Sequence, residues 1–344
     1  MRLCLTVLTC LVLSLPLSGP LKAGPWLVAD LDTGRVIASD NATDPWHPAS
    51  VTKLMTAYLA LKAVKAGKIS MNSALTVSEH AASMPPSKVG IKPGTTLTLD
   101  AALKILMVKS ANDVAVVVAE NLSGSVEAFA EEMNREAARL GMFDSRFVNP
   151  NGLFAEGQQT SARDMAILGR RLFLDFPRQS SLFGIPAIQL GKRVIENTNG
   201  IIGRYQGATG LKTGFICASG FNVVASAQRN GHRLIAVVFG ASSGAERTLK
   251  TMELLDSGFA APQTGFQQSL DMLPKSRAPL TDLRGMICGQ KEQNENDPPA
   301  EVQAGQAPRV IPPPLPPRDK AEPILVHLGG GKPAAPKKPA QKQS

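Results

Sequence analysis

Short apolar stretches with strand character flank the central part of the chain. WLVADLDTGRVIA contains two short strands around a turn at 32–34. FNVVASAQRNGHRLIAVVFG contains two more, over 221–227 and 233–239, and the Asn-Gly pair at 230–231 is a strong hairpin signal. A fifth strand is expected just before this hairpin, over 211–215.

Helical periodicity dominates the stretch between the two groups of strands. The expected helices are 51–66, 100–109, 113–121, 124–140, 161–173 and, after the last strand, 245–258. Strands at both ends with helices between them predict one antiparallel sheet formed from both ends of the domain and packed with a helical cluster. The predicted fold class is therefore α/β, in the layered α+β form, with five strands in the sheet.

The composition changes at the N-terminus. Arg2 precedes an apolar run that ends at Leu17, and small residues follow at Gly19 and Ala23, which is the arrangement of an export signal. The run is short for a membrane span, which needs about 20 residues. We expect residues 1–23 to be a signal peptide, although cleavage after Gly19 and retention as an anchor both stay open.

The composition changes again at the C-terminus. Twelve prolines lie between 298 and 339, and the residues from 329 onward carry lysines but no acid. Such a segment cannot bury enough apolar surface to offset its chain entropy. We expect a compact body over 24–262, followed by a polar, Pro/Lys-rich and largely disordered tail over 263–344.

The net charge and the cysteine content leave several classes of binding partner open. The 344 residues carry a formal net charge of +9, which suits nucleic acid, an acidic surface or an anionic substrate and does not choose between them. The four histidines are scattered and no Cys/His cluster has metal-ligand spacing, so we expect no metal site. Cys217 and Cys288 remain outside the signal, and whether they pair stays open.

The first candidate for chemistry is the pair Ser50 and Lys53 in PASVTKLMTAYLALKA. Pro48 and Ser50 suit a helix N-terminus, and residues i and i+3 share a helical face, so the hydroxyl and the amine can meet. A lysine made neutral by burial and nearby positive charge can take the proton of a serine nucleophile. The competing interpretation is a capping serine followed by a surface lysine, because S-x-x-K alone is a weak motif.

The second candidate is an S-x-N tripeptide, which occurs at Ser39, Ser70 and Ser110. The first two lie in polar connections that suit turns. Ser110-Ala111-Asn112 separates two apolar helices, so its side chains either project into an interior cleft or cap the second helix through Asn112.

The third candidate is Lys212-Thr213-Gly214, on the strand expected before the hairpin. The cation would attract a carboxylate, the hydroxyl would hydrogen-bond to it, and the glycine would let a substrate backbone approach closely. The alternative is an edge strand protected by a lysine.

Taken together and in this order, the three motifs resemble the S-x-x-K, S-x-N and K-T-G set of the penicillin-interacting serine enzymes. The resemblance covers roughly residues 25–260 and is closest to the low-molecular-mass penicillin-binding proteins, the D-alanyl-D-alanine carboxypeptidases. The segments that carry it are PASVTKLMTAYLAL, VKSANDVAVVVAE, FVNPNGL, TSARDMAILGRRL, ENTNGIIGRYQGATGLKTGF and ASAQRNGHRLIAVVFGA.

The resemblance implies a DD-peptidase/β-lactamase-like fold and an exported enzyme of the bacterial cell envelope, periplasmic or otherwise extracytoplasmic. The implied reaction removes the terminal D-alanine from peptidoglycan stem peptides through an acyl-enzyme. β-Lactam antibiotics are implied as covalent inhibitors. Neither a cofactor nor nucleic acid is implied.

The resemblance also implies roles for the residues of the first two motifs. Ser50 would form the acyl-enzyme and Lys53 would be its general base. Ser110 would relay a proton to the leaving D-alanine, and Asn112 would orient Lys53 and the substrate amide. A departure nearby is Asn151, which stands where relatives often carry a histidine.

The third motif would bind the substrate. Lys212 and Thr213 would hold the terminal carboxylate, and Gly214 would allow the close approach. The backbone N–H groups of Ser50 and Phe215 would form the oxyanion hole.

Three other functions stay open. A DD-endopeptidase that cuts peptidoglycan cross-links would use the same residues on a larger substrate. A class A β-lactamase would need a glutamate to activate the deacylating water, and no glutamate lies between Glu136 and Glu156. A non-catalytic envelope-binding protein would act through its basic tail, by weak electrostatic contact with anionic envelope components.

Overall fold

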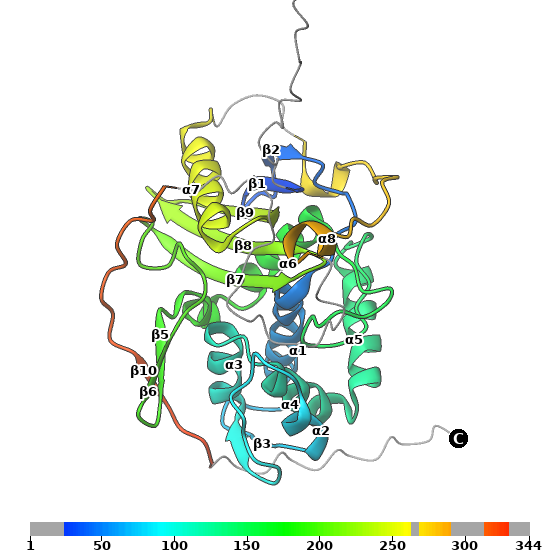
Figure 1. Ribbon diagram of the computed structural model, residues 1–344, viewed down its shortest axis with the longest axis vertical. Coiled ribbons are helices and arrows are strands. Elements are labelled where there is room, and N and C mark those ends of the chain that lie inside the picture. The colour runs from blue at the N-terminus through cyan, green and yellow to red at the C-terminus, as the bar shows by residue number, and fades with distance from the viewer. Residues whose placement is uncertain (1–23, 263–267, 290–312, 330–344) are drawn as a thin grey trace, which may run out of the picture.

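The computed structural model describes residues 24–262, 268–289 and 313–329 (Figure 1). The expected signal peptide at 1–23 and the lysine-bearing end from 330 onward lie outside the described residues. In the part of the chain that is described, no helix is long and apolar enough to cross a membrane.

The central element is a five-stranded antiparallel sheet in the order β2-β1-β9-β8-β7, which confirms the predicted fold class. Its strands are β1 (Trp26–Asp30), β2 (Val36–Asp40), β7 (Ala208–Ile216), β8 (Gly220–Arg229) and β9 (His232–Ala241). Asn230 and Gly231 both have positive φ, at 48° and 81°, which is the turn that an Asn-Gly pair favours between two strands.

Helices cover both faces of this sheet. Helix α7 (Gly244–Ala260) packs on one face, and α6 (Ala162–Asp175) packs on the other (Figure 1). Successive residues of β9 therefore enter two different cores: Leu234 joins the core beneath α7, and Ile235 joins the larger core shared with the helical cluster. Because both faces are buried, LIAVVF is an uninterrupted apolar run instead of an alternating one.

The helical cluster surrounds α1, which is buried on every side from Lys53 to Leu61. A short 3₁₀ turn, η1 (Ala49–Thr52), leads into this helix. The helices of the cluster are α1 (Lys53–Lys65), α2 (Glu79–Ser83), α3 (Leu99–Val108), α4 (Asn112–Ser123) and α5 (Val126–Arg139).

Several short elements have no counterpart among the predicted ones. They are β3 (Ala74–Thr76) with β4 (Thr96–Thr98), the 3₁₀ helix η2 (Pro177–Gly184), and the hairpin β5 (Ala187–Leu190) with β6 (Arg193–Glu196). Each strand spans only three or four residues, which is too short to establish a periodic pattern.

Two segments assigned by sequence to the disordered tail are ordered and packed on the body. Residues 268–289 contain η3 (Leu270–Met272) and α8 (Arg284–Ile287), and residues 313–329 contain β10 (Ile324–Val326), which pairs in parallel with β5. Isolated apolar side chains and backbone hydrogen bonds hold both segments on the body. Such contacts leave no periodic pattern in the sequence. The structure differs here from the expectation for residues after 262.

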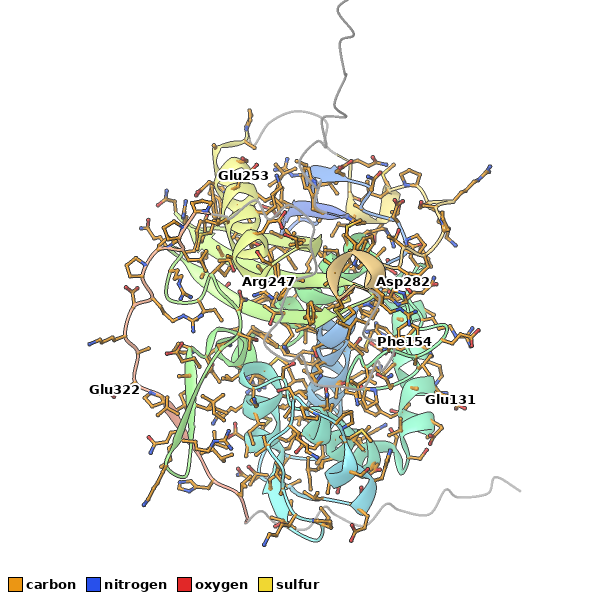
Figure 2. The ribbon with its side chains drawn as sticks, in the orientation of Figure 1. Glu131, Phe154, Arg247, Glu253, Asp282 and Glu322 are labelled. Carbon is orange, nitrogen blue, oxygen red and sulfur yellow. A yellow bond between two sulfur atoms is a disulfide. The ribbon has the colours of Figure 1, made fainter. Side chains whose placement is uncertain are left out.

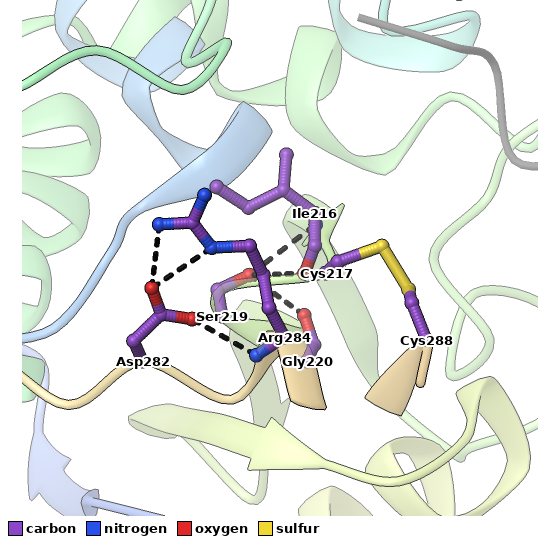
Figure 3. Close-up of a disulfide and its surroundings, with 7 residues drawn as sticks. All are labelled: Ile216, Cys217, Ser219, Gly220, Asp282, Arg284 and Cys288. Atoms are coloured by element: carbon purple, nitrogen blue, oxygen red, sulfur yellow. Dashed lines mark hydrogen bonds and ion pairs between the residues drawn. A yellow bond between two sulfur atoms is a disulfide. The ribbon is translucent and has the colours of Figure 1, made fainter. Parts of the chain in front are cut away.

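A disulfide fixes the first of these segments beside the end of β7. Cys217 and Cys288 are bonded, with an S–S distance of 1.97 Å (Figure 3). The backbone N–H of Leu283 also donates to Ala218 O over 2.9 Å. The pairing left open by the sequence is therefore present, and it joins α8 to the turn that follows the K-T-G strand.

Candidate active site

Ser50 lies in η1, at the turn that enters the buried helix α1. The preceding residue, Ala49, has φ +48°, a conformation that costs a non-glycine residue about 1 kcal/mol or more. The Ser50 side chain is half-buried, whereas Lys53 is fully buried. Lys53 Nζ lies 2.9 Å from Ser50 Oγ, so the i to i+3 spacing brings the two groups together as predicted from the sequence.

Lys53 Nζ has two further partners, both of them carbonyl oxygens. It donates to Asn112 Oδ1 over 2.8 Å and to the backbone O of Asn151 over 2.5 Å. A neutral amine has two hydrogens and one lone pair. As an ammonium, Lys53 donates to all three oxygens. In the neutral form, with both hydrogens committed to Asn112 and Asn151, the lone pair would face the Ser50 hydroxyl, which is the orientation that a proton acceptor needs.

The surroundings of Lys53 favour this neutral form. Burial lowers the pKa of Lys53 well below its ordinary value, and the positive charge of Lys212 lowers it further. Asp113 opposes both effects. The Asp113 carboxylate has donors of its own, since it accepts the backbone N–H of Gly90 over 2.8 Å and that of Val89 over 3.0 Å.

The Ser110–Asn112 tripeptide forms the turn between α3 and α4. Ser110 is buried with φ +63°, and Asn112 Nδ2 donates to Pro85 O over 3.1 Å while its Oδ1 accepts from Lys53. Asn112 therefore contacts Lys53, and its role in orienting this lysine and the substrate stays a prediction. Among the described residues no hydrogen bond joins Ser110 to Lys53, so Ser110 lies in the same turn as Asn112 without a direct link to this lysine.

The K-T-G strand lines the other side of the site. Lys212 is buried and its Nζ donates to Thr213 O over 2.8 Å. Burial, assisted by the charge of Arg247, lowers the pKa of Lys212 to about 7. Thr213 Oγ1 lies 2.7 Å from Thr198 Oγ1, and Arg247 donates to Thr198 O over 3.2 Å. Figure 2 labels Arg247, which extends from α7.

Gly214 brings this strand directly against Ser50. A Cβ at Gly214 would lie 2.8 Å from Ser50 N and 3.0 Å from Pro48 O, so only glycine allows β7 to approach η1 this closely. Phe215 follows on the same strand, with its ring 4.3 Å from that of Phe221. The predicted oxyanion pair, the N–H groups of Ser50 and Phe215, thus belongs to two backbone segments in close contact.

Two residues that the sequence did not single out contact the turn that carries Ser50. Asn222 on β8 donates to His47 O over 2.9 Å and to Pro48 O over 3.2 Å, and it ties the sheet to the turn. Gly152 has φ +84°, and a Cβ there would lie 1.9 Å from Ala49 O.

Other functional positions were also missed. The contribution of Asn151 is a backbone carbonyl, so the departure from histidine at that position leaves the contact to Lys53 intact. Thr198 and Arg247 reach the site from a loop and from a helix whose patterns carry no catalytic signal. The NPNG sequence around Gly152 was the only available indication, because its glycine and proline mark a tight turn.

Within the described ranges, no group of three or more His, Cys, Asp or Glu side chains could hold a metal ion.

Comparison with known proteins identifies relatives across the body of the chain. Residues 15–243 match the family model described as D-alanyl-D-alanine carboxypeptidase. The chain is 38% identical over 243 residues to D-alanyl-D-alanine carboxypeptidase DacF of Bacillus subtilis, which corresponds to 69% of this chain and 62% of that relative. The chain thus spans less than two thirds of the length of that protein.

Solved structures give the same result. The carboxypeptidase DacD from Francisella tularensis superposes with a TM-score of 0.69 at 28% identity, covering 70% of this chain and 71% of that one. Penicillin-binding protein D2 from Listeria monocytogenes, in its ampicillin-bound form, superposes with a TM-score of 0.61 at 30% identity, covering 69% and 97%.

Proposed function

The chain belongs to the D-alanyl-D-alanine carboxypeptidase family, and we propose that it is itself a serine peptidase that removes the terminal D-alanine from peptidoglycan stem peptides. The observation that carries the proposal is the hydrogen bonding of Lys53 Nζ, which commits two positions to Asn112 and Asn151 and directs the third at Ser50 Oγ. This arrangement suits a neutral lysine acting as a general base.

In the proposed acylation, Ser50 Oγ attacks the carbonyl carbon of the penultimate D-alanine while Lys53 takes the hydroxyl proton. Negative charge develops on the carbonyl oxygen, where the N–H groups of Ser50 and Phe215 stabilise it. The peptide bond then breaks as the leaving D-alanine nitrogen receives a proton through Ser110. Water subsequently hydrolyses the ester, which releases the shortened peptide and restores the Ser50 hydroxyl.

The free carboxylate of the substrate explains the cations on the other side of the site. Lys212 and Thr213 would hold it, with Arg247 adding positive charge behind Thr198. An approaching anion favours the ammonium form of Lys212, which burial and Arg247 disfavour before the substrate binds. Positive charge is thus available where the terminal carboxylate arrives.

The contacts around Glu136 support a peptidase over a class A β-lactamase. Glu136 is buried and paired with Lys62 and Arg139, and Glu156 is exposed. The Glu136 carboxylate is thus engaged by two cations and not by a water at Ser50. β-Lactams are therefore proposed as slowly released covalent inhibitors, which agrees with the ampicillin-bound form of the Listeria relative.

Export to the periplasm or another extracytoplasmic site, with a role in cell-wall biogenesis, completes the proposal. It rests on the signal-like sequence of residues 1–23 and on the substrate of the family. The proposed weak contact between the basic end of the chain and anionic envelope components involves residues beyond 329, outside the described ones.

Digestion of purified peptidoglycan, with the products read by mass, tests the proposal. A carboxypeptidase converts pentapeptide stems to tetrapeptides and releases free D-alanine, whereas an endopeptidase removes cross-linked dimers. The Ser50→Ala variant is the matched control and should produce neither change. Loss of dimers with pentapeptides left intact would replace the proposal with the endopeptidase alternative, and no change with the wild-type protein would refute both.

A further inference from the structure

Residues 313–329, which we call the C-terminal strap, run along the outside of the body beside β5 (Figure 1). The strand β10 pairs with β5, and the backbone N–H of Asp319 donates to Gly203 O over 2.7 Å. Near the end of the strap, the N–H of Gly329 donates to Thr96 O over 2.6 Å. The strap is therefore fixed to the body at separate places along its length.

Arg318 extends inward from the strap. Its side chain is only 14% exposed, although the residues on either side of it are exposed. Nη1 donates to Asn197 O over 3.0 Å and Nη2 donates to Asn199 O over 2.9 Å. Glu196 supplies a carboxylate 3.2 Å from Nη1. The planar guanidinium thus bridges two backbone carbonyls that are two residues apart, which a lysine cannot do with the same geometry.

The residue between those two carbonyls is Thr198. Asn197 and Asn199 are buried, whereas Thr198 is exposed between them. Its hydroxyl lies 2.7 Å from Thr213 Oγ1, and its carbonyl accepts from Arg247 over 3.2 Å. The two anchors of Arg318 therefore fix the residue that links the K-T-G strand to the buried arginine of α7.

The geometry points to Arg318 as a positioning residue for the reaction. By holding the carbonyls on either side of Thr198, it sets where Thr213 and Arg247 meet the terminal carboxylate of the substrate. This inference rests on the proposed function, because it assigns a role in binding that carboxylate. It also gives the strap a purpose: a segment more than one hundred residues away in sequence completes the substrate-binding edge.

The expected consequence is selective. Arg318 is far from Ser50, Lys53 and Asn112 in the sequence, and its polar partners in the described residues are Glu196, Asn197 and Asn199. The acylation chemistry should therefore remain intact when Arg318 is changed. The carboxylate-binding edge should instead lose its alignment, and a misplacement of about 1 Å can cost up to about 100-fold in rate. We expect a loss on the order of 10-fold, confined to substrates that carry a free carboxylate.

Two thioester probes test this inference. They share one acyl group and differ only in their leaving groups, one of which carries a free carboxylate while the other is its neutral ester. The measurement is kcat/KM for each probe with the full-length wild type and with Arg318→Ala and Arg318→Lys. Arg193→Ala is the matched control, because it also removes an arginine but at an exposed position on strand β6.

The inference predicts that Arg318→Ala lowers the carboxylate-to-neutral ratio of kcat/KM about 10-fold, mainly through KM. Arg318→Lys should lower this ratio to an intermediate extent, and Arg193→Ala should leave it unchanged. Equal losses with both probes, or an unchanged ratio, would overturn the positioning role. Arg318→Lys allows the test even if Arg318→Ala fails to fold. If neither probe acylates the wild-type enzyme, the proposed function fails instead.

Discussion

Replacing Lys212 by methionine should make the protein more stable while it impairs substrate binding. Lys212 is 1% exposed, and burial together with Arg247 lowers its pKa from 10.5 to about 7. Each unit of such a shift corresponds to 1.36 kcal/mol, so keeping this lysine charged in the folded protein costs up to about 5 kcal/mol. Methionine fills a similar space without the charge.

The pH dependence follows from the direction of the shift. The folded pKa lies below the unfolded one, so between about pH 7 and 10.5 the unfolded chain binds more protons and stability rises with pH. Below pH 7 the destabilisation is complete. The free energy of unfolding of Lys212→Met should therefore exceed that of the wild type by about 5 kcal/mol at pH 6 and about 2 kcal/mol at pH 9. Lys212 also lowers the pKa of Lys53. Removing the charge of Lys212 therefore favours the folded state through Lys53 as well.

Urea unfolding of wild type and Lys212→Met at pH 6 and pH 9 measures this difference, because titration of the groups that Lys212 does not influence cancels between the two proteins. Lys92→Met, at an exposed lysine in a loop, is the control and should show no pH-dependent gap. The reasoning about the buried charge would be refuted if the two proteins differed in free energy of unfolding by the same amount at both pH values. It would also be refuted if Lys212→Met were less stable than the wild type at pH 6.

Three further predictions concern the site and its supports. Lys53→Ala should slow acylation by on the order of 10³-fold, and the wild-type acylation rate in stopped-flow assays should rise with pH through an ionisation well below 10.5, whereas a flat profile would contradict the neutral base. Gly214→Ala should abolish acylation but leave the far-ultraviolet circular dichroism spectrum native, because its Cβ would lie 2.8 Å from Ser50 N; normal acylation would show that β7 can move away. Reduction of the Cys217–Cys288 disulfide, which spans 71 residues, should lower the free energy of unfolding by about 4 kcal/mol in a urea titration, and an unchanged midpoint would show that the 268–289 segment contributes no stability.

The sheet and the longer helices could be predicted from the sequence because each imposes a periodic pattern or a turn signal. The Asn-Gly hairpin is the clearest case, since both residues adopt the positive φ that the dipeptide favours. The pairing of Ser50 with Lys53 was also accessible, because it depends only on helical spacing.

The remaining parts of the site depend on contacts that leave no local pattern. Arg318 and Arg247 act through single side chains on backbone carbonyls, and Asn151 contributes a carbonyl that every residue type has. The strap was assigned to a disordered tail because its prolines exclude regular structure. Its attachment uses one short parallel strand, one arginine and separate backbone hydrogen bonds, which composition cannot show.

Covalent labelling with a fluorescent penicillin, followed by mass mapping of the labelled peptide, tests the central claim most directly. The account predicts a single acyl adduct on Ser50, formed more slowly in Lys53→Ala and absent in Ser50→Ala. An adduct on any other residue, or persistent labelling of Ser50→Ala, would contradict the assignment of Ser50 as the nucleophile activated by Lys53.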